Sequence, residues 1–198
     1  MAPCTYSFPV TTAEEFVLLS GILEGVGVTA YLGAAAFIAD KFALTAGGSI
    51  LTIEARHSSL IRAARGQDPL PQPFDVPLGF NEVFSLASAF IKACPASNPP
   101  LPFKAFPGLA LVDAPAIIKS GDKIKLVPAA QVDPKDLNVA FITLTGPLFA
   151  QTVYNAGRFE VVVPAGVNGQ SYAVLVKGHE KVCDDTTVAG PVIVEISN

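Results

Sequence analysis

The sequence has few of the residues on which common catalytic and nucleic-acid sites depend. Its 198 residues include two histidines, His57 and His179, no tryptophan and no cluster of Lys or Arg, and its formal net charge is −4. A protein without a basic patch lacks the electrostatic footprint of phosphate-backbone binding, so we predict no nucleic-acid partner. The chain also has no Gly-x-Ser-x-Gly motif and no phosphate-cradling glycine loop, which argues against hydrolase and nucleotide-binding functions.

Long apolar runs and a signal peptide are also missing. Met1 is followed by Ala-Pro-Cys, with neither a charged n-region nor an apolar h-region, so we expect no signal peptide in this chain. The uncharged stretch 25–39 is shorter than the roughly 20 residues that a spanning helix needs. The uncharged stretch 137–157 is interrupted by Gly146-Pro147 and by polar residues. We therefore predict no membrane span.

The three cysteines, Cys4, Cys94 and Cys183, permit one disulfide and one leftover thiol. Cys4 and Cys94 flank the helical region predicted below, so a bridge between them would staple that region. Such a bridge suits an oxidising compartment, and we expect a secreted or extracellular protein. The alternative is a reduced protein with three free thiols.

The hydrophobic pattern predicts three helices in the first half of the chain. Thr12 and Glu15 have the spacing of a capping box, and a long first helix is expected over about 12–36. A second helix, antiparallel to the first, is expected over about 42–65 and ends at Gly66. Four prolines then predict a loop, and a third helix is expected over about 81–93.

Beyond residue 94 the pattern changes from a period of 3.6 to a period of 2. We predict a helical domain over 1–94, a proline-rich linker over 95–107 and a β-sandwich domain over 108–198. Turn residues lie between the β-rich runs at Asn155-Ala-Gly157 and Asn168-Gly169. Strands are predicted at 109–112, 123–127, 138–145, 158–163, 172–177 and 191–196.

Three residues have the chemistry and spacing of metal ligands. Glu24 lies in an apolar stretch of the first helix, where a carboxylate is costly unless it is paired, protonated or bound to metal. Glu54 and His57 are three apart and therefore project from one face of the second helix. Ferritin-like dimetal bundles use a Glu from each of two helices and a Glu-x-x-His from each of two others. This chain has one helix with a Glu and one with a Glu-x-x-His, so two copies in a homodimer would complete the four-helix ligand set.

The alternative to a metal site is a buried polar cluster, in which Glu24 or Glu54 pairs with Arg56 or with His57. Tyr31, two turns after Glu24, is a candidate hydrogen-bond donor to a ligand carboxylate. The alternative, which its type favours, is a packed aromatic residue with its hydroxyl at the edge. Arg56 is the corresponding candidate on the second helix. His179 lies in a charged stretch that is typical of a solvated loop.

Three segments resemble the ferritin-like family of desiccation-related and stress-response proteins, mostly fungal and bacterial. They are Leu23–Ala35, Ile50–His57 and Pro73–Phe84, and the resemblance covers about residues 3–107. It implies that Glu24, Glu54 and His57 match ligand positions, while two earlier helices of the family are lacking here. It also implies a secreted protein. The expected fold class is an α+β multi-domain protein: a helical hairpin plus a third helix, which is half of a ferritin-like bundle, followed by an all-β immunoglobulin-like sandwich.

Three functional hypotheses follow. The first is a homodimer that shares a dimetal centre of iron, manganese or zinc, with oxidase or peroxide-related activity. The second is a metal-free structural or interaction protein of the cell surface, with dimerising helices and a β-sandwich binding module. The third is a truncated product that needs a separate partner to finish its bundle.

Overall fold

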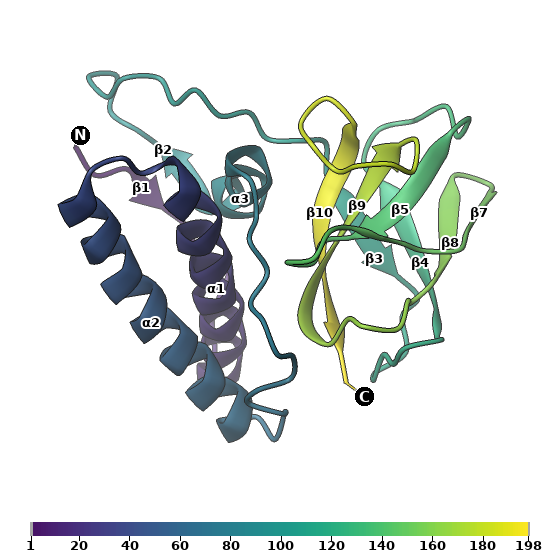
Figure 1. Ribbon diagram of the computed structural model, residues 1–198, viewed down its shortest axis with the longest axis horizontal. Coiled ribbons are helices and arrows are strands. Elements are labelled where there is room, and N and C mark those ends of the chain that lie inside the picture. Colours follow the sequence, from purple (N-terminus) through teal and green to yellow (C-terminus); the bar gives the residue numbers. More distant parts are fainter. Residues whose placement is uncertain (1, 198) are drawn as a thin grey trace.

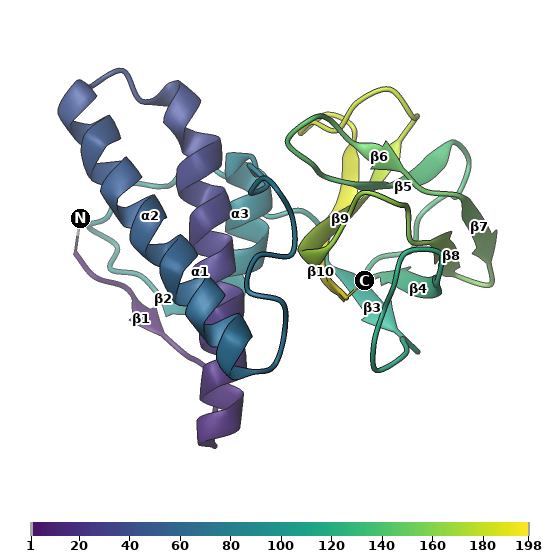
Figure 2. The same ribbon diagram turned by 60° about the horizontal axis from the view of Figure 1, so that its bottom comes forward.

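The computed structural model describes residues 2–197, so Met1 and Asn198 lie outside the described residues. It consists of a helical part beside a β-sandwich (Figure 1). Helices α1, α2 and α3 pack together, and the strands from residue 109 onward form the second body (Figure 2). The predicted fold class is confirmed.

Helix α1 spans Ala13–Ala34 and is followed by a 3-10 turn over Ala35–Phe37. It begins with the predicted capping box: the Thr12 hydroxyl accepts from the backbone N–H of Glu15 at 3.1 Å, and the Glu15 carboxylate accepts from the backbone N–H of Thr12 at 3.1 Å. These bonds satisfy two of the donors that a helix N-terminus leaves free. The sequence therefore located the start of this helix to within one residue.

Helix α2 spans Lys41–Ala64, and Asp40 caps it by accepting from the backbone N–H of Ala43 at 2.6 Å. It runs antiparallel to α1, as predicted (Figure 1). Three glycines lie where the helices meet, so the two backbones approach closely: Gly21 faces Ile61, Gly27 faces Glu54, and Gly47 faces Tyr31.

Helix α3, Phe80–Ala87, is shorter than predicted. A 3-10 turn follows over Ser88–Phe90, and Ile91–Ala93 then forms strand β2, which pairs with β1, Thr5–Tyr6. The predicted helix over 91–93 is thus wrong. Local periodicity does not record this pairing, because the partner strand lies at the other end of the helical part.

The predicted disulfide between Cys4 and Cys94 is present, and it links the segments at the ends of β1 and β2. Cys183 is a free thiol on the sandwich. A hydrogen bond with Thr186 lowers the pKa of the Cys183 thiol.

The proline-containing segment between α2 and α3 lies along α1. Leu78 donates its backbone N–H to the carbonyl of Thr29 at 3.3 Å, and Gly33 lies against the Leu78 carbonyl. Val76 and Leu78 are buried together with Tyr172 of the sandwich. The segment is therefore a packed layer between α1 and the β-sheet.

The sandwich consists of two four-stranded antiparallel sheets, with strand orders β10-β9-β5-β6 and β3-β4-β8-β7. The strands are β3 Leu109–Val112, β4 Lys123–Pro128, β5 Leu137–Phe141, β6 Leu148–Phe149, β7 Thr152–Asn155, β8 Arg158–Val162, β9 Gly169–Lys177 and β10 Thr187–Ile196. Strands β6 and β7 were not predicted. The turn between β7 and β8 uses Ala156 and Gly157, both at positive φ, as the predicted turn chemistry requires.

The main core lies between these two sheets. Both sheets contribute fully buried side chains, among them Leu126 and Phe159 from one and Phe141 and Leu175 from the other. Strands β9 and β10 also face the helical part, where Tyr172 and Ile193 pack on the segment that covers α1. The sheet β10-β9-β5-β6 therefore contributes one face to the main core and the other face to the contact with the helical part.

The segment Ala13–Phe37 is long and apolar enough to cross a membrane by length and composition. Counting uncharged residues missed it, because Glu24 interrupts the run. In the structure α1 packs on α2 and α3, and Glu24 contacts His57, which are contacts typical of a bundle helix.

Candidate metal centre

Glu24 and His57 face each other across the α1–α2 contact. Oε1 of Glu24 lies 3.2 Å from Nδ1 of His57. The side chain of Glu24 is 28% exposed and that of His57 is 49% exposed. The pair therefore lies at the edge of the helical part and is accessible from outside.

Glu54 lies one turn before His57 on α2, and its carboxylate packs against Gly27 of α1. Its Oε2 atom is buried and has no hydrogen-bond partner among residues 2–197. A Cβ atom at position 27 would lie 2.5 Å from this oxygen, so any larger residue would require the carboxylate to shift. A buried carboxylate oxygen without a partner is costly, which marks Glu54 as a group that the fold alone does not satisfy.

The electrostatics agree with this geometry. Burial raises the pKa of the Glu54 carboxyl, the negative charge of Glu24 raises it further, and His57 opposes the shift. Glu54 therefore interacts with both members of the Glu24–His57 pair. The structure brings the three predicted ligand residues together between two helices.

Two carboxylates and one imidazole are donors that suit iron, manganese or zinc. Within residues 2–197, however, no group of three or more His, Cys, Asp and Glu side chains is arranged to hold a metal ion. The unpaired Glu54 oxygen could serve as a cation ligand, but the three residues are half of the set that a dimetal centre requires.

The other predicted residues lie around this cluster or away from it. The ring of Tyr31 faces Gly47 and lines an apolar cavity with Phe80 and Phe103, and its hydroxyl makes no hydrogen bond within the described chain. Arg56 is exposed. His179 contacts the ring of Phe149 on the sandwich. Supporting roles for Tyr31 and Arg56 stay predictions.

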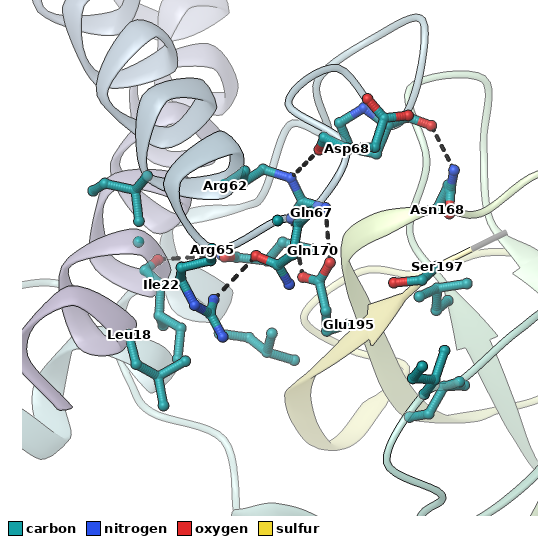
Figure 3. Close-up of a pocket in the computed structure, with 18 of the residues that line it drawn as sticks. Leu18, Ile22, Arg62, Arg65, Gln67, Asp68, Asn168, Gln170, Glu195 and Ser197 are labelled. Atoms are coloured by element: carbon teal, nitrogen blue, oxygen red, sulfur yellow. Dashed lines mark hydrogen bonds and ion pairs between the residues drawn. The ribbon is translucent and has the colours of Figure 1, made fainter. Parts of the chain in front are cut away.

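A second group of polar residues, which the sequence did not reveal, joins the helical part to the sandwich. Arg62 of α2 is 8% exposed and donates to both oxygens of Glu195 on β10, at 3.1 and 2.8 Å (Figure 3). Gln170 and Tyr172 of β9 hydrogen-bond to the backbone of α1. Arg62, Gln170 and Glu195 border a cavity of about 760 Å³ between α1, α2 and the sandwich. In the sequence, this junction is indicated only by Arg62, a charged residue on the inner side of α2.

Comparison with known proteins agrees with the ferritin-like resemblance. Residues 1–67 match the family described as ferritin-like domain. The protein named Protein rds1 of Schizosaccharomyces pombe is 28% identical over 112 residues, which cover 57% of this chain and 28% of that protein. The chain thus spans less than a third of the length of this relative. The matched family segment includes α1 and α2, the two helices that carry Glu24, Glu54 and His57.

Proposed function

We propose that Glu24, Glu54 and His57 form half of a dimetal centre, which a second copy of this chain completes in a homodimer. The observation that carries this proposal is the buried Oε2 of Glu54, which has no hydrogen-bond partner among residues 2–197. Two copies would bring four carboxylates and two imidazoles to one site, the set that ferritin-like dimetal bundles use. The bound metal would be iron, manganese or zinc.

An apolar stripe on α2 supports a second copy as the partner. Phe42, Ile50, Ile53 and Leu60 are exposed along one face of the helix, and Phe42 and Leu60 reach 85% and 69% exposure. Their successive spacings of eight, three and seven residues place them on one face of the helix, and His57, four residues after Ile53, lies on the same face. A two-fold contact along this stripe would bury apolar surface and bring both copies of His57 toward a shared core.

The residues of this chain would have distinct roles in such a centre. Glu54 would bind metal through its unpaired oxygen, and Glu24 would be shared between metal and His57. Gly27 would keep α1 close to the Glu54 carboxylate. Iron or manganese with an open coordination position supplies oxidase or peroxide-related chemistry. We also propose an extracellular location, with which the disulfide is compatible.

The test is elemental analysis together with molar mass, on protein purified without chelator or affinity metal. We expect a dimer with about one metal per chain. Glu54→Ala combined with His57→Ala should abolish metal uptake and leave the apolar contact in place, whereas Ile53→Glu should produce monomers. Leu144→Glu, at an exposed position of the sandwich, is the control. Unchanged metal content in the ligand variant contradicts the proposed ligands.

A metal-free interaction protein is the second candidate. It is favoured by the Glu24–His57 hydrogen bond, which gives each side chain a protein partner without a cation, and by the lack of a three-residue ligand group within the described residues. In this case the α2 stripe would still dimerise, and the sandwich would contact a partner. A dimer that contains no metal, and takes up none when iron, manganese or zinc is added, supports this function over the first.

A further inference from the structure

The β-sandwich contacts α1 at the turn that carries Glu24. The side-chain amide of Gln170 donates to the carbonyl of Ile22 at 3.2 Å, and the hydroxyl of Tyr172 donates to the carbonyl of Gly25 at 3.3 Å. Gln170 also donates to the Tyr172 hydroxyl at 2.8 Å. The two carbonyls bracket Glu24, so this connected set of bonds fixes the helix at the candidate ligand.

Gly25 and Gly27 allow close approach on opposite sides of α1. A Cβ atom at Gly25 would lie 2.6 Å from the Gln170 side chain, and one at Gly27 would lie 2.5 Å from the Glu54 carboxylate. Residues two apart on a helix point in nearly opposite directions. The helix is therefore held between the sandwich on one side and Glu54 on the other.

The same strand pair also holds α2. Glu195 of β10 lies directly opposite Gln170 of β9 in the antiparallel register. While Gln170 bonds to α1, Glu195 accepts two hydrogen bonds from Arg62 of α2 (Figure 3). Arg62 is also anchored by donating its Nε–H to the Asp68 carbonyl at 2.7 Å. One pair of facing strand residues thus connects to both helices of the candidate centre.

We propose that the β9–β10 pair is a clamp that sets the distance between α1 and α2, with Gln170, Tyr172 and Glu195 as positioning residues for the Glu24–Glu54–His57 cluster. The clamp presses Gly27 against the Glu54 carboxylate and keeps that oxygen away from other partners. As far as it concerns metal, this inference rests on the proposed function. It assigns the sandwich a role in the helical site.

The first test is titration of the full chain with Co²⁺, followed by the visible absorption of the bound ion. Gln170→Ala and Glu195→Gln should each weaken Co²⁺ binding about fivefold or more and change the absorption bands, because supporting groups orient metal ligands. Asn81→Ala is the matched control. It removes a hydrogen bond of 2.8 Å from α3 to Asp184 of the sandwich and one of 2.7 Å from the backbone N–H of Lys104, and neither bond involves α1 or α2. Equal affinity and spectra in all variants overturn the clamp.

A metal-free test separates the clamp from the proposed function. If the clamp forces α1 onto Glu54, then releasing it lets water reach the buried Oε2 atom of Glu54. Gln170→Ala should therefore raise the unfolding equilibrium constant of the wild-type chain by a smaller factor than it raises that of the Glu54→Gln variant. We expect the two factors to differ about threefold. If the wild-type chain takes up no Co²⁺, the proposed function fails, and this stability comparison alone tests the clamp. A threefold coupling between the two substitutions supports the clamp. Strictly additive effects on the free energy of unfolding overturn it.

Discussion

Glu195 and Arg62 are 133 residues apart in the chain and form a two-pronged ion pair across the junction of the helical part and the sandwich. The guanidinium is largely buried, and the carboxylate is about one-third exposed. Removing one partner leaves the other with an incompletely compensated charge in a poorly solvated place, whereas removing both does not. We therefore expect the stability losses from replacing Arg62 and Glu195 to be non-additive.

Arg62→Met and Glu195→Leu should each lower the free energy of unfolding by about 1–3 kcal/mol, and the double variant should be less destabilised than the sum of the two. Urea unfolding of the four proteins measures this. Arg158→Met and Asp113→Asn, which break an exposed ion pair within the sandwich, provide the comparison and should each cost less than about 1 kcal/mol. Asn is used at position 113 because this residue has a φ of 49°, a conformation that Asn tolerates. Additive losses at Arg62 and Glu195 would contradict the prediction.

Two helical glycines should respond in opposite ways to alanine. At Gly48 a Cβ atom meets nothing within 4 Å, so Gly48→Ala should stabilise the protein by about 0.5–1 kcal/mol through helix propensity. Gly27→Ala should destabilise it by about 1 kcal/mol, because the new methyl group displaces the end of the Glu54 side chain. Thermal unfolding compares them. Adding Glu54→Ala to Gly27→Ala should recover much of the loss, and a lack of recovery would show that another contact is responsible.

Glu54→Gln should stabilise the metal-free protein at neutral pH. Burial raises the pKa of the folded Glu54 carboxyl above its ordinary value of 4.5, so the folded state holds this proton more tightly than the unfolded state does. The resulting stabilisation is complete below the unfolded pKa and is lost as pH rises through the folded pKa. The gain in unfolding free energy from Glu54→Gln should therefore grow between about pH 4.5 and 7, to about 0.5–1 kcal/mol.

Unfolding free energies across this pH range, with chelator present, test that prediction. Glu14→Gln serves as the control, since Glu14 is exposed in the first turn of α1. Loss of a carboxylate near a helix N-terminus should cost only a few tenths of a kcal/mol. A Glu54→Gln variant less stable than wild type at pH 7 would show that the carboxylate has a partner that stabilises it.

Replacing Cys4 and Cys94 together by Ser should lower the free energy of unfolding by about 2–5 kcal/mol, because the bridge closes a loop with a sequence separation of 90 residues. Cys183→Ser should leave stability within about 0.5 kcal/mol, since it removes only a free thiol. Unfolding with and without reductant measures both effects. A wild-type protein that is insensitive to reductant would contradict a stabilising bridge.

The secondary structure was largely predictable because its signals are local. The capping box at Thr12 and the apolar pattern after it located α1, and the positions of α2 and of six strands followed from periodicity and turn residues. The errors occurred where a distant segment decided the outcome. Ile91–Ala93 is a strand because Thr5–Tyr6 lies beside it, and β6 and β7 are short strands whose pairing depends on their neighbours in the sheets.

The candidate site was predicted in composition but not in arrangement. A carboxylate in an apolar helix and a Glu-x-x-His spacing can be recognised from the sequence alone, so Glu24, Glu54 and His57 could be named together. That Glu24 bonds to His57 while an oxygen of Glu54 is left without a partner depends on the crossing of two helices. The junction residues Arg62, Gln170 and Glu195 gave almost no signal.

The sequence by itself determined the positions of the long helices and of six sandwich strands, which cysteines flank the helical part, and which side chains share a face of α2, because these depend on the spacing of a few residues. Only the tertiary structure decided how α1 and α2 are held. The contacts from Gln170 to Ile22 and from Glu195 to Arg62 span 148 and 133 residues. No local pattern records such contacts, because they exist only after the sandwich has folded and packed on the helices.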